Sequence, residues 1–154
     1  MQTFDALRSL APSGFTAACH IRFTTPSMMF QTYPVDWITL YGQNGWVMSD
    51  PTVRWAFGNF GAIRWSDIPL PDPKDILGQA ATYGLVHGVI FATGADDDRT
   101  ISGIARADRP YLDSEIAEAT VLVGRIHHLT DQHMGLPEGL SEALTQARIL
   151  HKLH

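Results

Sequence analysis

The sequence has a single cysteine, no long apolar run and no excess of positive charge. Cys19 alone excludes an intramolecular disulfide and a multi-cysteine zinc site, so a reducing, cytoplasmic compartment is expected. No stretch of about 18 consecutive apolar residues is present, which argues against a membrane-spanning helix. Lys and Arg number 11 against 16 Asp and Glu, and the net charge of −5 gives this chain no general attraction for DNA phosphates.

Recognisable catalytic motifs are also missing. The sequence has no nucleophile elbow, no phosphate-binding loop and no glycine-rich dinucleotide fingerprint, so neither an enzyme nor a cofactor is expected. Three of its seven histidines, His127, His128 and His133, gather with Asp131 at the end of one expected helix. No HExxH pattern accompanies them, and we expect solvated histidines near a helix C-terminus rather than a metal site.

What is present fits one folded domain, because the 154 residues are 45% hydrophobic and only 18% charged. Apolar periodicity and the positions of proline and glycine predict an order of helix, two strands, helices, two strands and a long helix. This order indicates an α+β fold in which helices cover an antiparallel sheet. The expected helices are 3–10, 34–43, 51–60, 74–83, 113–133 and 141–154, and the expected strands are 15–24, 27–33, 85–93 and 99–107.

The densest pattern of candidate functional residues lies in residues 32–52. Tyr33, Trp37 and Tyr41 are spaced four apart and share one face of the expected helix, and Asp50 and Thr52 follow them. A row of aromatic side chains ending at a carboxylate and a hydroxyl is typical of a small-molecule pocket with an apolar body and a polar head. An aromatic stripe is also the ordinary way to bury a helix, so a plain core position is the alternative for these aromatics.

The pattern Tyr-x-x-x-Trp-x-x-x-Tyr, followed by Asp-Pro-Thr, resembles the autoinducer-binding domain of LuxR-type quorum-sensing regulators. The resemblance runs from about Gly14 to His133 and includes Trp65 and the Gly-Leu-x-x-Gly segment that begins at Gly84 and ends at Gly88. It implies an α-β-α sandwich with a central antiparallel sheet of about five strands and helices on both faces. The domain is expected to span residues 1–134.

Members of that family bind N-acyl homoserine lactones, and the resemblance implies specific roles here. Trp37 would donate to the lactone carbonyl, Asp50 would accept from the amide N–H, and Tyr33 would donate to the acyl carbonyl. One donor and two acceptors on the ligand would thereby be satisfied in a dry cavity. The remaining expected ligand-binding residues are Tyr41, Thr52, Val53, Trp65, Leu77, Ala80, Leu85, Ile104 and Arg106.

Arg106 departs from the family, which usually has a small hydroxyl residue at this place. Alternation along the expected strand puts Ser102, Ile104 and Arg106 on one face. If that face points inward, the guanidinium enters the pocket and needs a partner, for which Asp50 is the nearest candidate. The alternative is that the strand ends by Ala105 and Arg106 points to water.

Family members also carry a C-terminal helix-turn-helix domain. Residues 135–154 resemble a linker and the first helix of such a domain, so the chain is expected to be a truncated regulator or a solitary sensor. The expected partners are a small-molecule signal, a second copy of the chain through 113–133 or the first helix, and DNA only through a further domain. The alternatives are a solitary dimerisation module that inhibits full-length regulators without binding a lactone, and an acyl-lactone hydrolase with Asp50 as the base.

Overall fold

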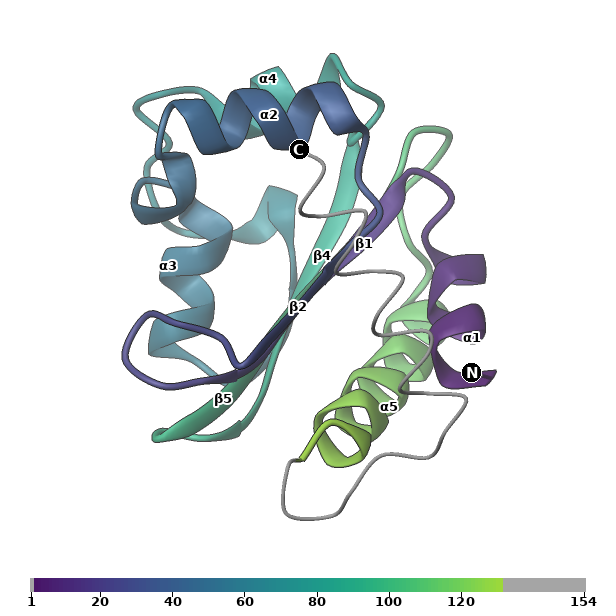
Figure 1. The fold of residues 1–154 in the computed structure, drawn as a ribbon. Helices are drawn as coiled ribbons and strands as arrows, with labels where there is room; N and C mark the ends of the chain where they lie inside the picture. Colours follow the sequence, from purple (N-terminus) through teal and green to yellow (C-terminus); the bar gives the residue numbers. More distant parts are fainter. Residues whose placement is uncertain (1, 132–154) are drawn as a thin grey trace.

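A five-stranded antiparallel sheet forms the middle of the computed structural model, which describes residues 2–131 (Figure 1). The strand order is β2-β1-β5-β4-β3, and every neighbouring pair is antiparallel. Helices cover both faces, so the expected α-β-α sandwich with about five strands is confirmed. The strands are β1 (Gly14–Ile21), β2 (Met28–Gln31), β3 (Gly61–Arg64), β4 (His87–Ala95) and β5 (Asp98–Arg106).

One face of the sheet packs against the first and last described helices, α1 (Gln2–Leu10) and α5 (Asp113–Leu129), which lie together on one side of Figure 1. Side chains at alternate positions of β1, β4 and β5 point to this face, as the period of two in a strand requires. The apolar stripe of α5 is buried against this face, because Val123 and Ile126 are buried and Ile116 and Leu129 pack against the same cluster. Its largest fully buried members include Leu7, Phe30, Val89, Phe91 and Ile104.

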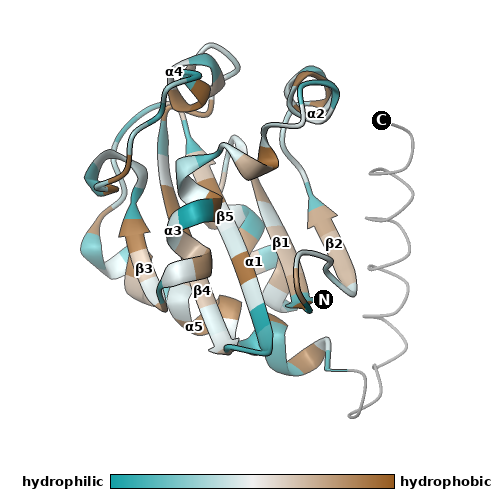
Figure 2. Ribbon diagram, turned by 90° about the vertical axis from the view of Figure 1, so that its left-hand side faces the viewer, coloured by the Kyte–Doolittle hydropathy of each residue, from teal (hydrophilic) through white to brown (hydrophobic). Residues whose placement is uncertain are grey.

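The other face is covered by short helices. These are α2 (Val35–Gln43), α3 (Pro51–Gly58) and α4 (Ile76–Ala81), together with the 3₁₀ turns η1 (Trp46–Met48) and η2 (Trp65–Asp67). Helices α2 and α4 stand at the same end of the sheet, and α3 crosses its face nearer the middle (Figures 1 and 2). The strand residues that point to this second face, such as Ile90 and Ile101, form a second apolar cluster beneath these helices.

Most expected elements are found, with three differences. The expected strand 15–24 ends at Ile21, since His20 and Phe23 take up positive φ angles of 54° and 59° that interrupt extended pairing. The four-residue strand β3 was not predicted, and the expected helix 113–133 ends at Leu129. The expected helix 141–154 and the linker before it lie outside the described residues. Within residues 2–131, none of the helices combines the length and the apolar character needed to span a bilayer.

Candidate functional site

A cavity of about 380 Å³ lies between the sheet and the short helices of the second face. Every site residue expected from the sequence lines this cavity except Ile104 and Arg106. The aromatic and polar residues of 32–52 therefore meet around one space instead of forming a closed core. The expected residues that line it are Tyr33, Trp37, Tyr41, Asp50, Thr52, Val53, Trp65, Leu77, Ala80 and Leu85.

Helix α2 supplies an aromatic wall. Pro34 precedes the first helical residue with φ of −53°, which suits a helix start, and spacing by four then places Trp37 and Tyr41 on one side. The ring centroid of Trp37 lies 5.8 Å from that of Tyr41 and 5.5 Å from that of Tyr83, which follows α4. Trp37 is only 4% exposed, so this wall is fixed by packing on both sides.

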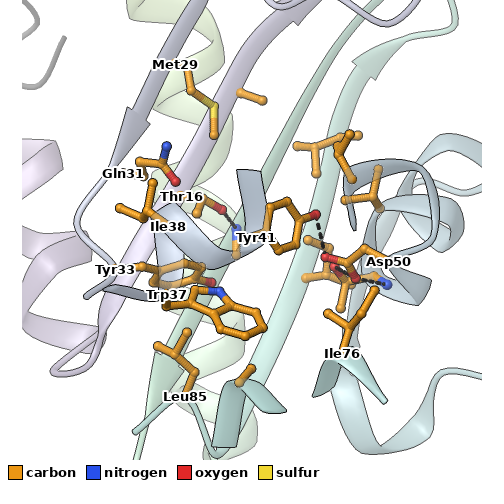
Figure 3. A pocket seen from close by; sticks show the side chains of 18 of the residues that line it. Thr16, Met29, Gln31, Tyr33, Trp37, Ile38, Tyr41, Asp50, Ile76 and Leu85 are labelled. Atoms are coloured by element: carbon orange, nitrogen blue, oxygen red, sulfur yellow. Dashed lines mark hydrogen bonds between the residues drawn. The ribbon is translucent and has the colours of Figure 1, made fainter. Parts of the chain in front are cut away.

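Asp50 forms the polar end of the cavity and also begins α3. Its Oδ1 accepts hydrogen bonds from the Thr52 backbone N–H at 2.8 Å and the Thr52 hydroxyl at 2.7 Å, which is N-cap geometry. Its Oδ2 accepts from the Tyr41 hydroxyl at 2.8 Å, and Figure 3 shows Tyr41 reaching from α2 to this carboxylate. One carboxylate thus starts a helix with one oxygen and faces the aromatic wall with the other.

The electrostatics of this end follow from burial. Asp50 is 8% exposed, and this desolvation raises the pKa of its carboxyl although the hydrogen bonds from Thr52 and Tyr41 act in the opposite direction. Burial, followed by the nearby charge of Asp50, raises the pKa of Tyr33 and of Tyr41. Within residues 2–131 no ion pair joins Asp50 to a cation, so its carboxylate can accept a hydrogen bond from a ligand that brings an N–H donor.

Trp65 contributes an unpaired donor at the cavity. Its indole Nε1 is buried and has no hydrogen-bond partner among the described residues, which is costly in a folded protein unless another molecule supplies the acceptor. Gly88 makes room for this ring, because a side chain at position 88 would overlap the indole. This close approach gives a physical role to the last glycine of the Gly-Leu-x-x-Gly segment.

The sheet floor of the cavity was missed by the sequence reasoning. Gly103 of β5 lies beneath Tyr33, and a Cβ at position 103 would lie 2.9 Å from the Tyr33 hydroxyl oxygen and 3.2 Å from Thr16 Oγ1. Thr16 in turn accepts a hydrogen bond from the Gly103 backbone N–H at 3.0 Å and hydrogen-bonds with Tyr33. Strand alternation could have identified Thr16 and Gly103 once the inward face was known. Other lining residues not predicted include Ala18, Met29, Gln31, Ile38, Ile76, Ile90 and Ile101.

The expectation that Ile104 and Arg106 face the pocket is wrong. Alternation does place both on one strand face, but that face packs against α1 and α5, and Ile104 is fully buried there. Arg106 pairs with Asp108 at 2.7 Å and with Glu115 at 3.4 Å, so Asp50 is not its partner. The prediction failed because the residues of β5 that face the cavity are the alternate ones, Ile101 and Gly103.

Three solved structures show the same fold. CepR2 of Burkholderia cenocepacia, described as an N-acylhomoserine lactone dependent LuxR-family factor, has a TM-score of 0.59 at 17% identity, covering 82% of this chain and 88% of that one. Escherichia coli SdiA gives 0.63 at 19% identity and 89% coverage, although this chain spans only 62% of SdiA. The VqsR ligand-binding domain of Pseudomonas aeruginosa gives 0.57 at 17% identity, covering 88% of this chain and 84% of that one.

Comparison with curated proteins gave no match by sequence. The family model of the autoinducer binding domain matches residues 8–130, which is most of the chain and contains every residue that lines the cavity. The chain therefore belongs to the autoinducer-binding domain family.

Proposed function

We propose that this domain is a sensor that binds an N-acyl homoserine lactone, or a closely similar neutral acylated signal, in the cavity beneath α2, α3 and α4. The observation that carries the proposal is the buried Asp50 carboxylate, which has no cationic partner among the described residues and stands at the end of an otherwise apolar and aromatic cavity. A carboxylate in that position is stabilised by a ligand that brings an N–H donor without bringing a charge.

The polar groups of the cavity match such a head group. The Asp50 carboxylate accepts the amide N–H, since two oxygens provide more acceptor positions than Thr52 and Tyr41 occupy. Trp37 donates its indole N–H to the lactone carbonyl, and Tyr33 donates its hydroxyl to the acyl carbonyl. Trp65 offers a further buried donor for a ring or chain oxygen.

The rest of the cavity suits an acyl chain. Its walls away from Asp50 are mostly aliphatic, aromatic or thioether side chains, which gain free energy by covering a hydrocarbon tail, and Thr16, Thr24 and Gln31 are the polar exceptions. CepR2 is described as dependent on N-acylhomoserine lactone, and SdiA has been solved in complex with octanoyl-rac-glycerol. Both ligand classes join a polar head to an acyl chain. The apolar residues of these walls include Ala18, Met29, Ile38, Val47, Val53, Phe57 and Leu77.

A hydrolase is the weaker alternative. Among the described residues that line the cavity there is no histidine, cysteine or lysine, so Asp50 is its only acid or base apart from the tyrosines. Asp50 is already held by Thr52 and Tyr41, and no histidine lines the cavity to act as a base for the Thr52 hydroxyl or for water. Ligand binding therefore requires fewer functional side chains in the cavity than hydrolysis does.

The wider role follows the family. The domain senses the signal in the cytoplasm as part of a regulator that acts on DNA through a separate helix-turn-helix domain, and it forms a homodimer. A solitary module that dimerises with full-length regulators without a ligand is the second candidate. The buried donor of Trp65 favours the ligand-binding reading over this one.

One experiment separates these readings. The purified chain is incubated with a panel of N-acyl homoserine lactones and with a monoacylglycerol, passed through a desalting column, and extracted for mass spectrometry. Intact lactone recovered in proportion to protein is the expected result. Ring-opened product would establish the hydrolase, and no retention of any panel member would contradict the sensor and favour the ligand-free module.

A further inference from the structure

A cluster of two histidines and an aspartate lies on the sheet face opposite the cavity. His20 comes from the end of β1, Asp98 from the start of β5, and His127 from the last turn of α5. His20 Nδ1 lies 2.7 Å from Asp98 Oδ1, and His127 Nε2 lies 3.9 Å from Asp98 Oδ2. The two imidazole rings stack with centroids 4.4 Å apart and an angle of 25° between their planes.

A β-bulge brings His20 to this cluster. The register of β1 against β5 shifts between Ala18 and Ile21, and His20 has a left-handed φ of 54°. Without the bulge, alternation would point position 20 to the cavity face together with Thr16 and Ala18. A left-handed backbone is costly for a residue other than glycine, and such strain is concentrated where a side chain has to be aimed for a purpose.

The hydrogen bonds at Nε2 of His20 determine which ring nitrogen is unprotonated in the neutral imidazole. Its Nε2 lies 2.8 Å from the His127 carbonyl oxygen and 3.0 Å from Thr130 Oγ1, and the Thr130 hydroxyl donates its own hydrogen to the Ile126 carbonyl at 2.6 Å. Both neighbours of Nε2 are then acceptors, which assigns the hydrogen to Nε2. On the neutral ring Nδ1 then has a lone pair that faces a carboxylate oxygen of Asp98 at 2.7 Å. Two lone pairs this close need a positive charge between them, and a proton or a metal ion can supply it.

His127 is aimed at the same carboxylate. Its Nδ1 lies 2.6 Å from the Thr100 hydroxyl oxygen, which can accept from it and leaves Nε2 directed to Asp98. Gly94, with φ of +98°, lets the β4–β5 hairpin close on this ring, since a Cβ at position 94 would lie 2.8 Å from the His127 ring. Histidine ligands whose second nitrogen is held by an oxygen acceptor are the usual arrangement around a protein-bound metal.

We propose that His20 Nδ1, the Asp98 carboxylate and His127 Nε2 bind a divalent transition-metal ion of the Zn²⁺ type. Bonds of about 2.0–2.2 Å in tetrahedral geometry place neighbouring ligand atoms about 3.3–3.6 Å apart. On metal binding, the 2.7 Å between His20 Nδ1 and Asp98 Oδ1 would therefore lengthen and the 3.9 Å between His127 Nε2 and Asp98 Oδ2 would shorten, and the ligand atoms of the three residues already lie within 4.8 Å of one another. The Asp98 side chain is 36% exposed, so an ion can enter from solvent. The ion fastens the end of α5 to the β4–β5 hairpin, independently of any ligand in the cavity.

The test uses the whole chain without a histidine tag, stripped with EDTA and titrated with ZnCl₂ by calorimetry and with CoCl₂ by visible absorption. The unaltered chain is expected to bind one ion, with the intense absorption of tetrahedral Co²⁺. Asp98→Asn is expected to weaken Zn²⁺ binding at least tenfold. The matched control is His87→Gln, which removes a histidine at the opposite end of the hairpin and leaves the affinity unchanged.

A second measurement keeps the proposal decidable if Asp98→Asn does not fold. Nitrogen-detected NMR of the imidazole rings of the unaltered chain is expected to shift Nδ1 of His20 and Nε2 of His127 on addition of Zn²⁺. Zn²⁺ binding that is equally strong in folded Asp98→Asn, or ring signals of His20 and His127 that do not move, would overturn the metal site. The charge between His20 and Asp98 would then be a proton in a structural hydrogen bond only.

Discussion

Replacing Asp50 by Asn separates the contribution of this residue to the fold from its contribution to ligand binding. The Asn side chain keeps an acceptor for the Thr52 backbone N–H and hydroxyl, and its amide can donate to the Tyr41 oxygen. The three contacts within the protein are thereby retained, and the cost of burying a charge disappears. Asp50→Asn is therefore expected to fold with an unchanged or raised melting temperature.

The pH dependence of stability provides a check on this reasoning. Because burial raises the pKa of Asp50 in the fold above its ordinary value of 3.8, the native state holds the proton to higher pH than the unfolded chain. The unaltered protein gains stability from Asp50 below that ordinary pKa and loses it as the pH rises through the raised one. Thermal unfolding followed across this window should show that loss in the unaltered protein and not in Asp50→Asn.

Ligand binding should respond in the opposite direction. The lactone amide loses a charged acceptor, which is worth about 1.5–3 kcal/mol and corresponds to a roughly ten- to hundredfold weaker affinity. The fluorescence of Trp37 and Trp65, which line the cavity, reports the titration. Tyr41→Phe is the comparison, because it removes one neighbour of the carboxylate while leaving its charge, and should weaken binding less. Equal affinities for Asp50→Asn and the unaltered protein would refute the assignment of Asp50.

Three further outcomes are expected. Gly103→Ala places a methyl group 2.9 Å from the Tyr33 hydroxyl oxygen and should weaken lactone binding about three- to tenfold by calorimetry, whereas Gly124→Ala, which meets open space, should not. Arg106→Ser should leave the preference across a lactone panel unchanged, because the side chain pairs with Asp108 and Glu115 away from the cavity. It should cost about 1–3 kcal/mol in urea unfolding, because the largely covered Glu115 loses one of its two arginine partners. The chain should scatter light as a homodimer when lactone is present, and a monomer at high concentration would contradict this.

The parts of the site that could be predicted are those that depend on the spacing of residues close together in the sequence. Trp37 and Tyr41 follow Tyr33 at intervals of four, and Asp50 directly precedes Pro51, a residue favoured at the first position of a helix. Helical geometry and capping fix the relative directions of these side chains within a few residues. The sequence could therefore indicate the aromatic wall and its polar end without knowledge of the sheet.

The sheet floor of the cavity depends on which face of β5 points to the short helices, and the local sequence does not determine this. Strand β5 has Ser102 and Ile104 on one face and Ile101 and Gly103 on the other, and both sets are compatible with burial. Which set faces the cavity is decided by where α5 packs, which is a long-range contact. Strand β3 was missed for a related reason, because its four residues include Arg64 and form a strand only by pairing with β4.

The packing of α5 also bears on the expectation of a homodimer. Its apolar stripe, which includes Ile116 and Leu129, packs against α1 and the sheet and is therefore not left free for a second copy of the chain. The homodimer stays a prediction whose support is the family. Two exposed residues, Leu112 just before α5 and Val121 within it, are the positions to test in an interface.

The two faces of the sheet divide stability from binding. Against α1 and α5 the sheet builds a closed core in which Phe91, Ile104 and Ile126 are almost fully buried. Against the short helices it leaves a cavity of about 380 Å³ that apolar side chains do not fill. An acyl ligand would complete this second core by burying its chain against Ile90 and its neighbours, so binding should raise the melting temperature by mass action. The first core is closed without any contribution from the cavity, whereas the second core has room that a bound ligand would fill.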